Sequence, residues 1–383
     1  MQGRKKLLIL VEWFIPGYKA GGPIQSCVNL CIVLKDSFDI YVLTTDTDHG
    51  ENSPYDDILG NHWIVEPTIG VQVYYARKPG PGFNDLAKLI REVAPDFIYL
   101  NLLFSPSFVL YPLWLVFTKK VHGRVILCPR GTLYDSAISL KWYKKRPLLL
   151  FIKWIGIHRQ ITFHATNPRE EKAINQYFPG SKIIIADNLP NTLQPPFSPC
   201  VKIVGSLRCI FIARIVPIKN LLFLLQCLET VQQAITLTIV GPIENERYWL
   251  DCKKAIGLLP QNIAVEYAGP KQNSALLSLL QQHHLFVLPT TGENFGHAIF
   301  ESLLAGRPVV ISDQTPWQDM EENKAGWVLP LHDAEKFVEV INGLAGCNQE
   351  RFNEYARGAW QYANHFIDNP GLIEPYKKLF GAG

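Results

Sequence analysis

The sequence predicts an α/β protein of two doubly wound, Rossmann-like domains, and three observations lead to this prediction. Short apolar runs alternate with helical patterns along the whole chain, which is typical of parallel sheets covered by helices. The length of 383 residues exceeds one ordinary domain and suits two. Near the middle, four prolines crowd into one short stretch, where neither a helix nor a central strand can continue: Pro190, Pro195, Pro196 and Pro199.

The strand candidates are short apolar runs, and helical patterns fill most of the gaps between them. In the first half the expected strands are Leu7–Val11, Ile40–Thr44, Val71–Tyr75, Phe97–Leu100, Val125–Cys128, Ile161–Ala165 and Ile183–Ala186. In the second half they are Leu207–Ala213, Leu237–Val240, Ala264–Tyr267, Leu285–Leu288, Pro308–Ile311 and Trp327–Leu329. We place the linker at about Pro195–Lys202, which gives a first domain over 1–198 and a second over 199–365.

Composition and charge narrow the function classes. Hydrophobic residues make up 48% and charged residues 19% of the chain, which is a globular balance. The net charge of +3 comes with no dense Lys/Arg tract, so we expect no nucleic-acid partner. The eight cysteines lack zinc-type spacing and are expected to be reduced, mostly buried thiols of a cytoplasmic protein. Cys27 and Cys31 should share one buried helix face.

No segment is expected to span a membrane or to act as a signal peptide. The apolar run at residues 7–11 is too short for a signal peptide and is followed at once by Glu12, so a buried strand is the better interpretation. The most apolar stretch, Leu102–Phe117, is interrupted by Pro106 and Pro112 and falls short of the ~20 residues that a spanning helix needs.

The first segment that could carry chemistry is the loop Gly17–Pro23, directly after the first strand. Gly21 and Gly22 remove side chains where backbone N–H groups and a helix N-terminus could approach a phosphate or a sugar. A tight strand-to-helix turn is the alternative. The pattern is neither GxGxxG nor a Walker loop, so dinucleotide and Walker-type sites lose their main support.

The second segment, Phe211–Asn220, delivers two cations at the carboxyl end of a buried strand, Arg214 and Lys219. Solvated surface charges are not normally placed there. Together the two cations could neutralise a diphosphate leaving group. Ordinary surface charge is the alternative interpretation.

The third segment, Pro289–Glu301, begins where a buried strand ends and then opens a helix, with Glu293 before the helix and Glu301 within it. Such carboxylates can each accept a pair of hydroxyl hydrogen bonds, while N–H groups near Gly296 and His297 face the same space. This combination suits a sugar nucleotide. The alternative is a helix cap at Glu293 and a solvated helix residue at Glu301.

In order and spacing, these segments resemble those of the retaining glycosyltransferases of family four, which have the GT-B fold of two facing Rossmann-like domains. Glu293 and Glu301 match the E-x7-E motif that ends the fourth strand of the family's second domain. The Pro-Arg-Gly sequence at 129–131, with the first glycine loop, resembles the branch that builds bacterial surface polysaccharides. The final His365–Phe380 resembles the terminal helix that crosses back, so residues from about 366 to 383 would complete the first domain.

The resemblance implies roles for the site residues, with Glu293 on the donor sugar, Glu301 on the nucleotide ribose, and the two cations on the diphosphate. The residues assigned to catalysis are charged groups near the reacting sugar: Glu293, Arg214, Lys219 and Arg130. The residues assigned to substrate binding lie in the first glycine loop and at the start of the donor helix: Gly21, Gly22, Glu293, Asn294, Phe295, Gly296, His297 and Glu301. We expect a UDP- or GDP-sugar donor bound in the interdomain cleft, and no cofactor.

One position departs from the family. Many members place a histidine just after a first-domain strand, near the reacting sugar, whereas the corresponding stretch here is Val125–Thr132. Arg130 is the cation in this stretch and the candidate to stand beside the donor sugar or phosphate.

Asp46-Thr47-Asp48 spells DxD, which holds a divalent metal in the other large glycosyltransferase fold. The motif follows the second strand, far in sequence from the donor segments, so a solvated turn is the expectation. We predict no essential metal, with Arg214, Lys219 and helix amides meeting the diphosphate charge.

The segment 140–159 mixes a basic cluster, aromatic residues and an apolar run. It could lie on the anionic inner face of the plasma membrane and present the enzyme to a lipid-linked glycan acceptor. A core-facing helix with a solvated basic end is the alternative. Pro147 favours a break in this segment over one continuous helix.

The leading functional hypothesis is a retaining transferase that moves a sugar from a nucleotide diphosphate sugar to a hydroxyl acceptor, in bacterial polysaccharide or lipopolysaccharide biosynthesis. A sugar-nucleotide 2-epimerase on the same fold is the first alternative, and the E-x7-E spacing weighs against it. A non-catalytic nucleotide-sugar-binding subunit is the second, suggested by the missing histidine.

Overall fold

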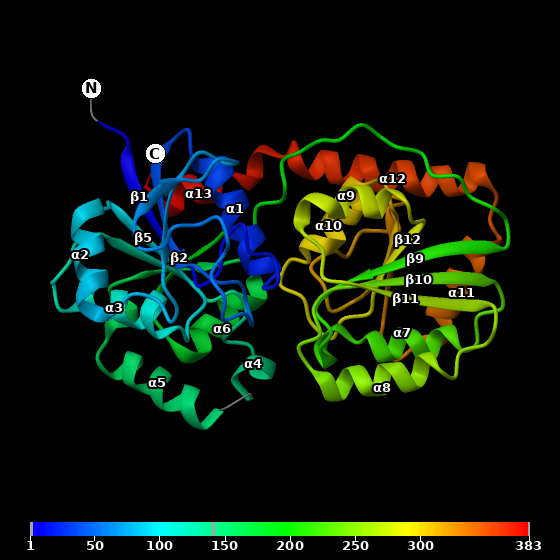
Figure 1. The fold of residues 1–383 in the computed structure, drawn as a ribbon, viewed down its shortest axis with the longest axis horizontal. Coiled ribbons are helices and arrows are strands. Elements are labelled where there is room, and N and C mark those ends of the chain that lie inside the picture. The colour runs from blue at the N-terminus through cyan, green and yellow to red at the C-terminus, as the bar shows by residue number, and fades with distance from the viewer. Residues whose placement is uncertain (1–2, 140–141, 382–383) are drawn as a thin grey trace. The chain divides into compact units, whose positions relative to one another are not determined.

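The computed structural model describes residues 3–139 and 142–381, and the chain divides into two compact units (Figure 1). The first unit comprises Met1–Leu189 together with Pro370–Gly383, and the second comprises Pro190–Asn369. The chain leaves the first unit after Leu189, whereas the sequence predicts the end of the first domain at residue 198. It re-enters the first unit at Pro370, whereas the sequence predicts this return at about residue 366.

The first unit is built on an eight-stranded sheet whose order is β3-β4-β2-β1-β5-β6-β7-β8. All neighbouring strands are parallel except β3, which pairs antiparallel with β4. The strands are β1 (Lys5–Leu10), β2 (Phe38–Thr45), β3 (Trp63–Val65), β4 (Gln72–Ala76), β5 (Phe97–Asn101), β6 (Arg124–Cys128), β7 (Thr162–Ala165) and β8 (Lys182–Ile185).

Alternate side chains of these strands enter two separate cores, one on each face of the sheet. In β1, Leu7 and Ile9 face the core under α1 and α13, whereas Leu8 and Leu10 face the core under α2, α3, α5 and α6. The helices of this unit are α1 (Gly22–Leu34), α2 (Phe83–Val93), α3 (Tyr111–Phe117), α4 (Asp135–Ser139), α5 (Trp142–Trp154), α6 (Pro168–Tyr177) and α13 (Glu374–Leu379).

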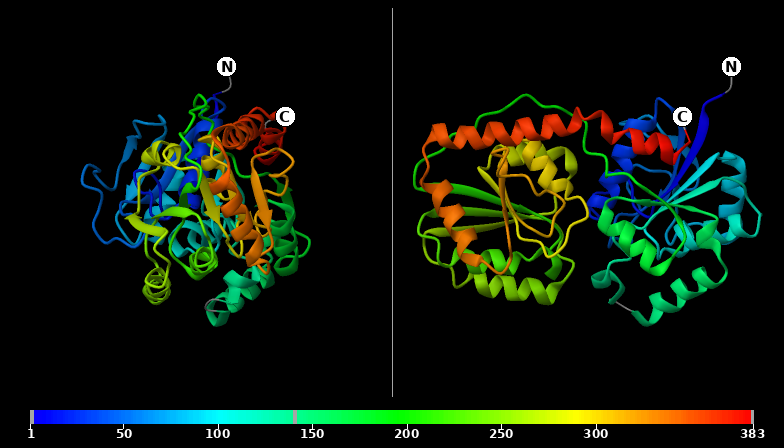
Figure 2. Two further views of the ribbon diagram at one scale, coloured as in Figure 1. Left: turned by 90° about the vertical axis from the view of Figure 1, so that its right-hand side faces the viewer. Right: turned by 180° about the vertical axis from the view of Figure 1, so that it is seen from behind.

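The terminal helix α13 is an integral part of the first core. Phe380, directly after it, is fully buried, and its ring centroid lies 5.5 Å from that of Phe38 and 5.6 Å from that of Phe97. The hydroxyl of Tyr376 donates to the carbonyl of Asp187 at 2.8 Å. Figures 1 and 2 show this red helix beside the blue strand β1, so the two ends of the described chain meet on one sheet face.

The second unit holds a six-stranded, entirely parallel sheet of order β11-β10-β9-β12-β13-β14. Its strands are β9 (Ser206–Ile212), β10 (Ala234–Val240), β11 (Ile263–Gly269), β12 (Leu285–Leu288), β13 (Val309–Ser312) and β14 (Gly326–Leu329). Its helices are α7 (Leu221–Leu228), α8 (Glu246–Ile256), α9 (Asn273–Gln281), α10 (His297–Leu304), α11 (Ala334–Gly346) and α12 (Gln349–Ile367).

Helices cover both faces of this second sheet. Helix α7 contacts α8 and α11 on one face, whereas α10 contacts α9 and α12 on the other, and Figure 1 shows the strands between the two groups. The central strands β12 and β13 are continuously buried and β9 is buried over its last four residues, as expected for a parallel sheet with both faces covered. This order places the loops after β9 and β12 next to each other at the carboxyl edge.

The structure confirms the predicted fold class, and each of the predicted strands overlaps an observed one. The strand β3 was not predicted because Trp63–Val65 is a short, partly exposed edge with no alternating pattern. The interpretation of Pro147 was wrong, since α5 runs through it. The carbonyl that Pro147 leaves without an amide partner belongs to Tyr143, which is exposed and can be hydrated. Residues 140–141 of the predicted membrane segment lie outside the described residues.

The expected burial of the cysteines is confirmed, because all eight side chains are buried. Cys27 and Cys31 lie in the same core cluster under α1. Among the described residues, no helix combines the length and the apolar character needed to cross a bilayer.

Candidate functional site

Arg214 and Lys219 follow β9, in a loop that the neighbouring strand holds in place. The amide of Ala213 donates to the carbonyl of Val240 at 3.0 Å, and the amide of Ile215 donates to that of Pro242 at 2.8 Å. Gly241 lies between these two acceptors with φ 142°, and a Cβ there would sit 1.9 Å from the carbonyl oxygen of Ala213. Only glycine lets the two loops approach this closely. Sequence reasoning missed Gly241, although the Gly-Pro pair at the end of β10 was the available signal.

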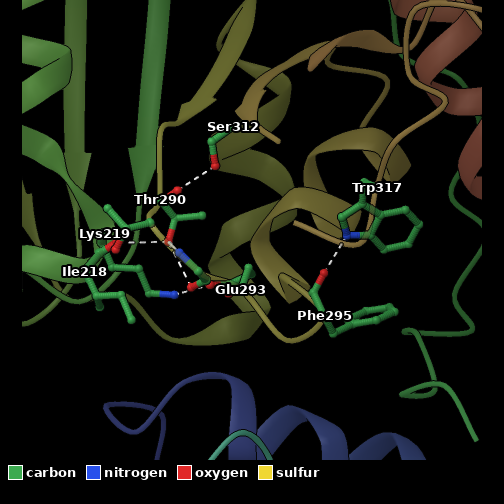
Figure 3. Close-up of polar contacts among 9 residues, drawn as sticks. Ile218, Lys219, Thr290, Glu293, Phe295, Ser312 and Trp317 are labelled. Atoms are coloured by element: carbon green, nitrogen blue, oxygen red, sulfur yellow. Dashed lines mark hydrogen bonds and ion pairs between the residues drawn. The ribbon is translucent and has the colours of Figure 1, made fainter. Parts of the chain in front are cut away.

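The carbonyl of Ile218 joins this loop to the loop after β12. It accepts hydrogen bonds from the amide of Thr291 at 2.8 Å and from the hydroxyl of Thr290 at 3.0 Å (Figure 3). The amide of Glu293 donates to the carbonyl of Gln314 at 3.0 Å, which ties the same loop to the segment after β13. Three strand ends therefore fix the backbone that carries Lys219 and Glu293.

Lys219 and Glu293 form an ion pair, with the ammonium facing the carboxylate in Figure 3. Their side chains are only 14% and 16% exposed, so water screens the pair less than it would on an open surface. Removing either partner leaves the other charge half-buried and uncompensated. The structure thus brings together two predicted residues that are far apart in sequence.

Arg214 is more accessible than Lys219. Its guanidinium donates to both carboxylate oxygens of Glu244, at 2.9 and 3.2 Å, and its side chain is 40% exposed. An exposed pair of this kind contributes little to stability, so the guanidinium can exchange Glu244 for another anion at low cost. Glu244 is a second residue that the sequence did not reveal.

The loop after Glu293 turns through Gly296 into α10. Gly296 is the helix N-cap with φ 82°, a left-handed conformation that few side chains tolerate. The first amides of α10 point toward the same edge as the loop, and amides at a helix start have no acceptor within their own helix. Asn294 and His297 are half-buried beside this turn.

Phe295 faces the core of the second unit. It is 6% exposed and packs against Trp317 and Phe366, with ring centroids 5.1 and 6.3 Å away. The indole N–H of Trp317 donates to the Phe295 carbonyl (Figure 3). The side chain predicted to bind substrate therefore anchors the loop, and only its backbone remains near the carboxyl edge.

Glu301 lies within α10, half-buried. Burial raises the pKa of its carboxyl to about 8, and a hydrogen bond from Asn273, at the start of α9, acts in the opposite direction. A carboxyl in this position is not the solvated helix residue of the alternative interpretation.

In the first unit, Gly21 is the N-cap of α1 and Gly22 its first residue. Asp48 shapes the glycine loop, because its carboxylate accepts hydrogen bonds from the backbone amides of Tyr18 at 2.9 Å and of Lys19 at 3.2 Å. Asp46 and Asp48 are 3% and 6% exposed, so the expectation of a solvated turn was wrong. The DxD sequence is buried because its second carboxylate satisfies backbone amides of the neighbouring loop.

Arg130 also lies in the first unit, after β6, with its backbone at φ 50°. Its guanidinium donates to Asn101 at 2.8 Å, to Asn188 at 2.6 Å and to the hydroxyl of Tyr99 at 3.4 Å. The loop itself is fixed by the buried carboxylate of Glu170, which accepts the amide of Gly131 at 2.5 Å. Arg130 is thus a positioned, half-buried cation within a polar network.

Sequence reasoning missed a carboxyl at the topological switch point of the first sheet. Strand β1 lies between β2 and β5, where the chain order reverses, and ligands of doubly wound sheets bind outside the strand ends at such a point. Glu12 follows β1, and Ser105, which hydrogen-bonds to its carboxyl, follows β5. Burial raises the pKa of Glu12, which Ser105, His49 and Lys78 partly offset.

The signal for this position was available in the sequence as a carboxylate and a tryptophan directly after the first strand. The ring of Trp13 packs edge-on against His49, with centroids 4.5 Å apart.

The predicted site residues fall into two groups. The second unit gathers Arg214, Lys219, Glu293, Asn294, Gly296, His297 and Glu301 at the carboxyl ends of β9 and β12, whereas the first unit carries Gly21, Gly22 and Arg130. Over residues 3–139 and 142–381, no three His, Cys, Asp or Glu side chains are grouped in a way that could hold a metal ion.

Comparison with known proteins agrees with this architecture. Residues 206–346 match the family model "Glycosyl transferases group 1". No curated protein matches the chain. Sucrose-phosphate synthase from Thermosynechococcus elongatus has a similar structure, with a TM-score of 0.69 at 13% identity, covering 99% of this chain and all of that one.

Two further solved structures share the fold. HepE from Anabaena, in complex with UDP and glucose, gives a TM-score of 0.70 at 15% identity over 99% of this chain and 100% of that one. WaaG, a glycosyltransferase involved in lipopolysaccharide biosynthesis, gives 0.63 at 11% identity over 98% of both chains. Residues 206–346, within the second unit, thus match the group 1 glycosyltransferase model, and along its length the chain shares the GT-B fold of these solved structures.

Proposed function

We propose that the protein transfers a sugar from a nucleoside diphosphate sugar to a hydroxyl acceptor, with retention at the anomeric carbon. The observation that carries the proposal is the half-buried Lys219–Glu293 pair beside the start of α10, where the loops after β9 and β12 meet. One cation, one carboxylate and helix amides suit a ligand with a diphosphate between a sugar and a nucleoside. The UDP complex of the similar Anabaena protein supports a UDP-sugar as the first donor to test, with a GDP-sugar second.

The proposed reaction needs no protein nucleophile. The bond between the anomeric carbon and the β-phosphate oxygen breaks, and the acceptor oxygen bonds to that carbon on the same face. The acceptor proton passes to the departing phosphate oxygen. Lys219 and Arg214 stabilise the charge that develops on the diphosphate, and Glu293 contacts the donor sugar. Glu301 accepts hydrogen bonds from the ribose hydroxyls of the nucleotide.

The first unit supplies the acceptor side in this proposal. Gly21 and Gly22 leave room for a ligand at the start of α1, and Arg130 presents a fixed cation. Glu12 and Trp13, at the switch point, are suited to a saccharide hydroxyl and a saccharide face. We further propose a lipid-linked glycan acceptor of bacterial polysaccharide or lipopolysaccharide synthesis, reached at the inner face of the plasma membrane.

A donor panel and two substitutions test the proposal. UDP-, GDP- and ADP-sugars are compared for the rise in unfolding temperature that they cause and for transfer to extracted lipid-linked glycan, and NMR of the product gives the anomeric configuration. Arg214→Ala and Lys219→Ala should abolish transfer while keeping the fold. Lys254→Ala, which removes an exposed lysine of an ordinary surface pair, is the matched control. Full transfer in both site variants would contradict the assignment.

The proposal also makes the reaction independent of a divalent metal, because Arg214, Lys219 and helix amides meet the diphosphate charge. Transfer should persist after dialysis against EDTA. Loss of transfer that added Mg²⁺ or Mn²⁺ restores would contradict this part of the proposal alone.

A further inference from the structure

The first unit contains an apolar pocket that the transfer chemistry does not use. Its volume is about 550 Å³, within the range of small-molecule sites, and its walls come from α2, α3 and α5. Phe83, Leu110, Leu148 and Ile152 are among the lining residues, and the hydroxyl of Tyr111 and the indole N–H of Trp114 are the polar side-chain groups in the lining. A cavity with such walls selects a hydrocarbon rather than a sugar or a nucleotide.

The outer rim of the pocket is unusually apolar for a protein surface. Phe151, which lines the pocket, is 44% exposed, and on the same helix α5 Trp154 is 83% and Leu150 66% exposed. The ring of Trp114 in α3 stacks on Phe151 with centroids 6.4 Å apart, and Phe151 is 6.4 Å from Trp154. Contiguous exposed aromatics of this kind mark a surface that meets an apolar partner, and tryptophan is favoured at membrane interfaces.

The charge around the pocket indicates which apolar partner it meets. Among the helices that form its walls, α5 carries four basic residues and no acidic one, α3 carries no charge, and α2 is balanced, with two acidic and two basic residues. Lys144, Arg146 and Lys153 are exposed on α5 itself. A docking helix from another protein needs no such bias, whereas anionic headgroups attract it directly.

We propose that this pocket takes one acyl chain of an anionic membrane phospholipid, with the basic side chains of α5 on the headgroups and the aromatic rim in the interface. The pocket would then fix the depth and orientation of the first unit on the bilayer, beyond the loose attraction of a basic helix. The inference deepens the proposed membrane-bound acceptor, but lipid binding can be measured without any transfer.

The test uses the full chain and vesicles of phosphatidylglycerol and phosphatidylcholine, with pure phosphatidylcholine vesicles for comparison. Leu148→Trp fills the pocket from its half-buried lining and leaves the surface at least as apolar. If a chain enters the pocket, Leu148→Trp should weaken sedimentation with the anionic vesicles by roughly 10-fold and abolish binding of dioctanoyl phosphatidylglycerol below its micelle concentration. Leu258→Trp, at an exposed site in the second unit, is the matched control and should change neither.

A charge variant separates the two parts of the interaction. Lys144→Gln with Lys153→Gln should weaken vesicle binding by roughly 30-fold, about 1 kcal/mol for each charge, yet leave Leu148 and the pocket open. The thermal unfolding midpoint checks each variant, and Leu110→Trp is a second pocket filler if Leu148→Trp does not fold.

Two results would overturn the inference. One is unchanged vesicle and short-chain lipid binding in both pocket fillers. The other is a dimer of the wild-type chain in sedimentation equilibrium that Leu148→Trp dissociates, with no lipid bound, because the rim would then be a self-association surface. Transfer to a soluble acceptor should be unaffected by Leu148→Trp, so a failure here is distinguishable from a failure of the proposed reaction.

Discussion

The ion pair between Lys219 and Glu293 connects two residues with different proposed partners. Lys219 is assigned to the diphosphate and Glu293 to the sugar, so the pair allows the two roles to be tested separately. In the absence of ligand each charge compensates the other. Removing one of them therefore leaves the other uncompensated and changes how strongly it attracts a charged ligand.

Glu293→Gln keeps the shape of the side chain and removes its charge. We expect kcat to fall by about 10²–10³-fold, the usual effect of losing one group that stabilises a transition state. UDP, which has no sugar, should bind at least as tightly as before, because Lys219 is released for the diphosphate. Isothermal titration with UDP and steady-state kinetics with the UDP-sugar measure the two effects. The control is Glu354→Gln, which removes an exposed partner of Lys324. A parallel loss of UDP affinity and kcat would contradict separate roles.

Glu301 should make stability depend on pH. Its folded-state pKa of about 8 lies above the reference value of 4.5, so the folded protein holds this proton more tightly than the unfolded chain. The stabilisation is fully present below pH 4.5 and is lost as the pH rises through about 8. Glu301→Gln should remove this loss, which thermal unfolding midpoints between pH 5 and about 9 would reveal. Parallel profiles for both proteins would rule out the buried, protonated carboxyl.

At the scale of elements, the loop after β9 depends on the close approach at Gly241. Gly241→Ala would place a methyl group against the Ala213 carbonyl and force the loop that carries Arg214 to move. We expect a cost of about 1–3 kcal/mol in unfolding free energy and roughly a 10²-fold loss in kcat/KM. Chemical denaturation and transfer kinetics measure the two quantities.

The matched control is Gly343→Ala in α11, where a Cβ meets nothing within 4 Å. That change should stabilise the protein by up to about 1 kcal/mol, as alanine does in helices. An active, undestabilised Gly241→Ala protein would show that the loop is not held by this contact.

Elements were predictable from the sequence where burial dictates composition. The strands β12 and β13 are buried along their whole lengths and are continuous apolar runs, and β9 is buried and apolar over its last four residues. The edge strand β3 has no such signature, and the helix through Pro147 depends on local exposure of a carbonyl. The edge strand and the proline-containing helix both depend on neighbouring segments and on exposure to solvent, and a short sequence pattern contains no information about either.

The candidate site was predictable only in part, where a local sequence pattern marks a residue's position. The glycine turn at Gly296 and the charges around it have local patterns, so they could be assigned to a strand end. The burial of Asp48 against the glycine loop and the bond from Ser105 to Glu12 join segments distant in sequence. The position of Phe295 in the core was also not predictable, because the residues near it in the sequence, Asn294 and His297, are polar.

At the scale of the whole molecule, the two units share one chain but hold separate cores. Phe380→Ala removes a fully buried ring between Phe38 and Phe97 and should destabilise the first unit by about 3–5 kcal/mol. Hydrogen–deuterium exchange should quicken in β1, β2 and β5 and stay unchanged in β9 and β12. UDP should still protect the second unit. Leu193→Ala, at a site 66% exposed, is the control. Equal loosening of both sheets would mean that the two units unfold as one.

The return of the chain at Pro370 also bears on how the protein is made. Residues 190–369 lie between β8 and α13 in the chain, so a ribosome makes the entire second unit before it makes the helix that covers one face of the first sheet. During that interval Phe38, Phe97 and Tyr99 lack their final partner. The nascent first unit therefore offers chaperones an apolar face until α13 and Phe380 emerge, whereas the second unit can fold as soon as it leaves the exit tunnel.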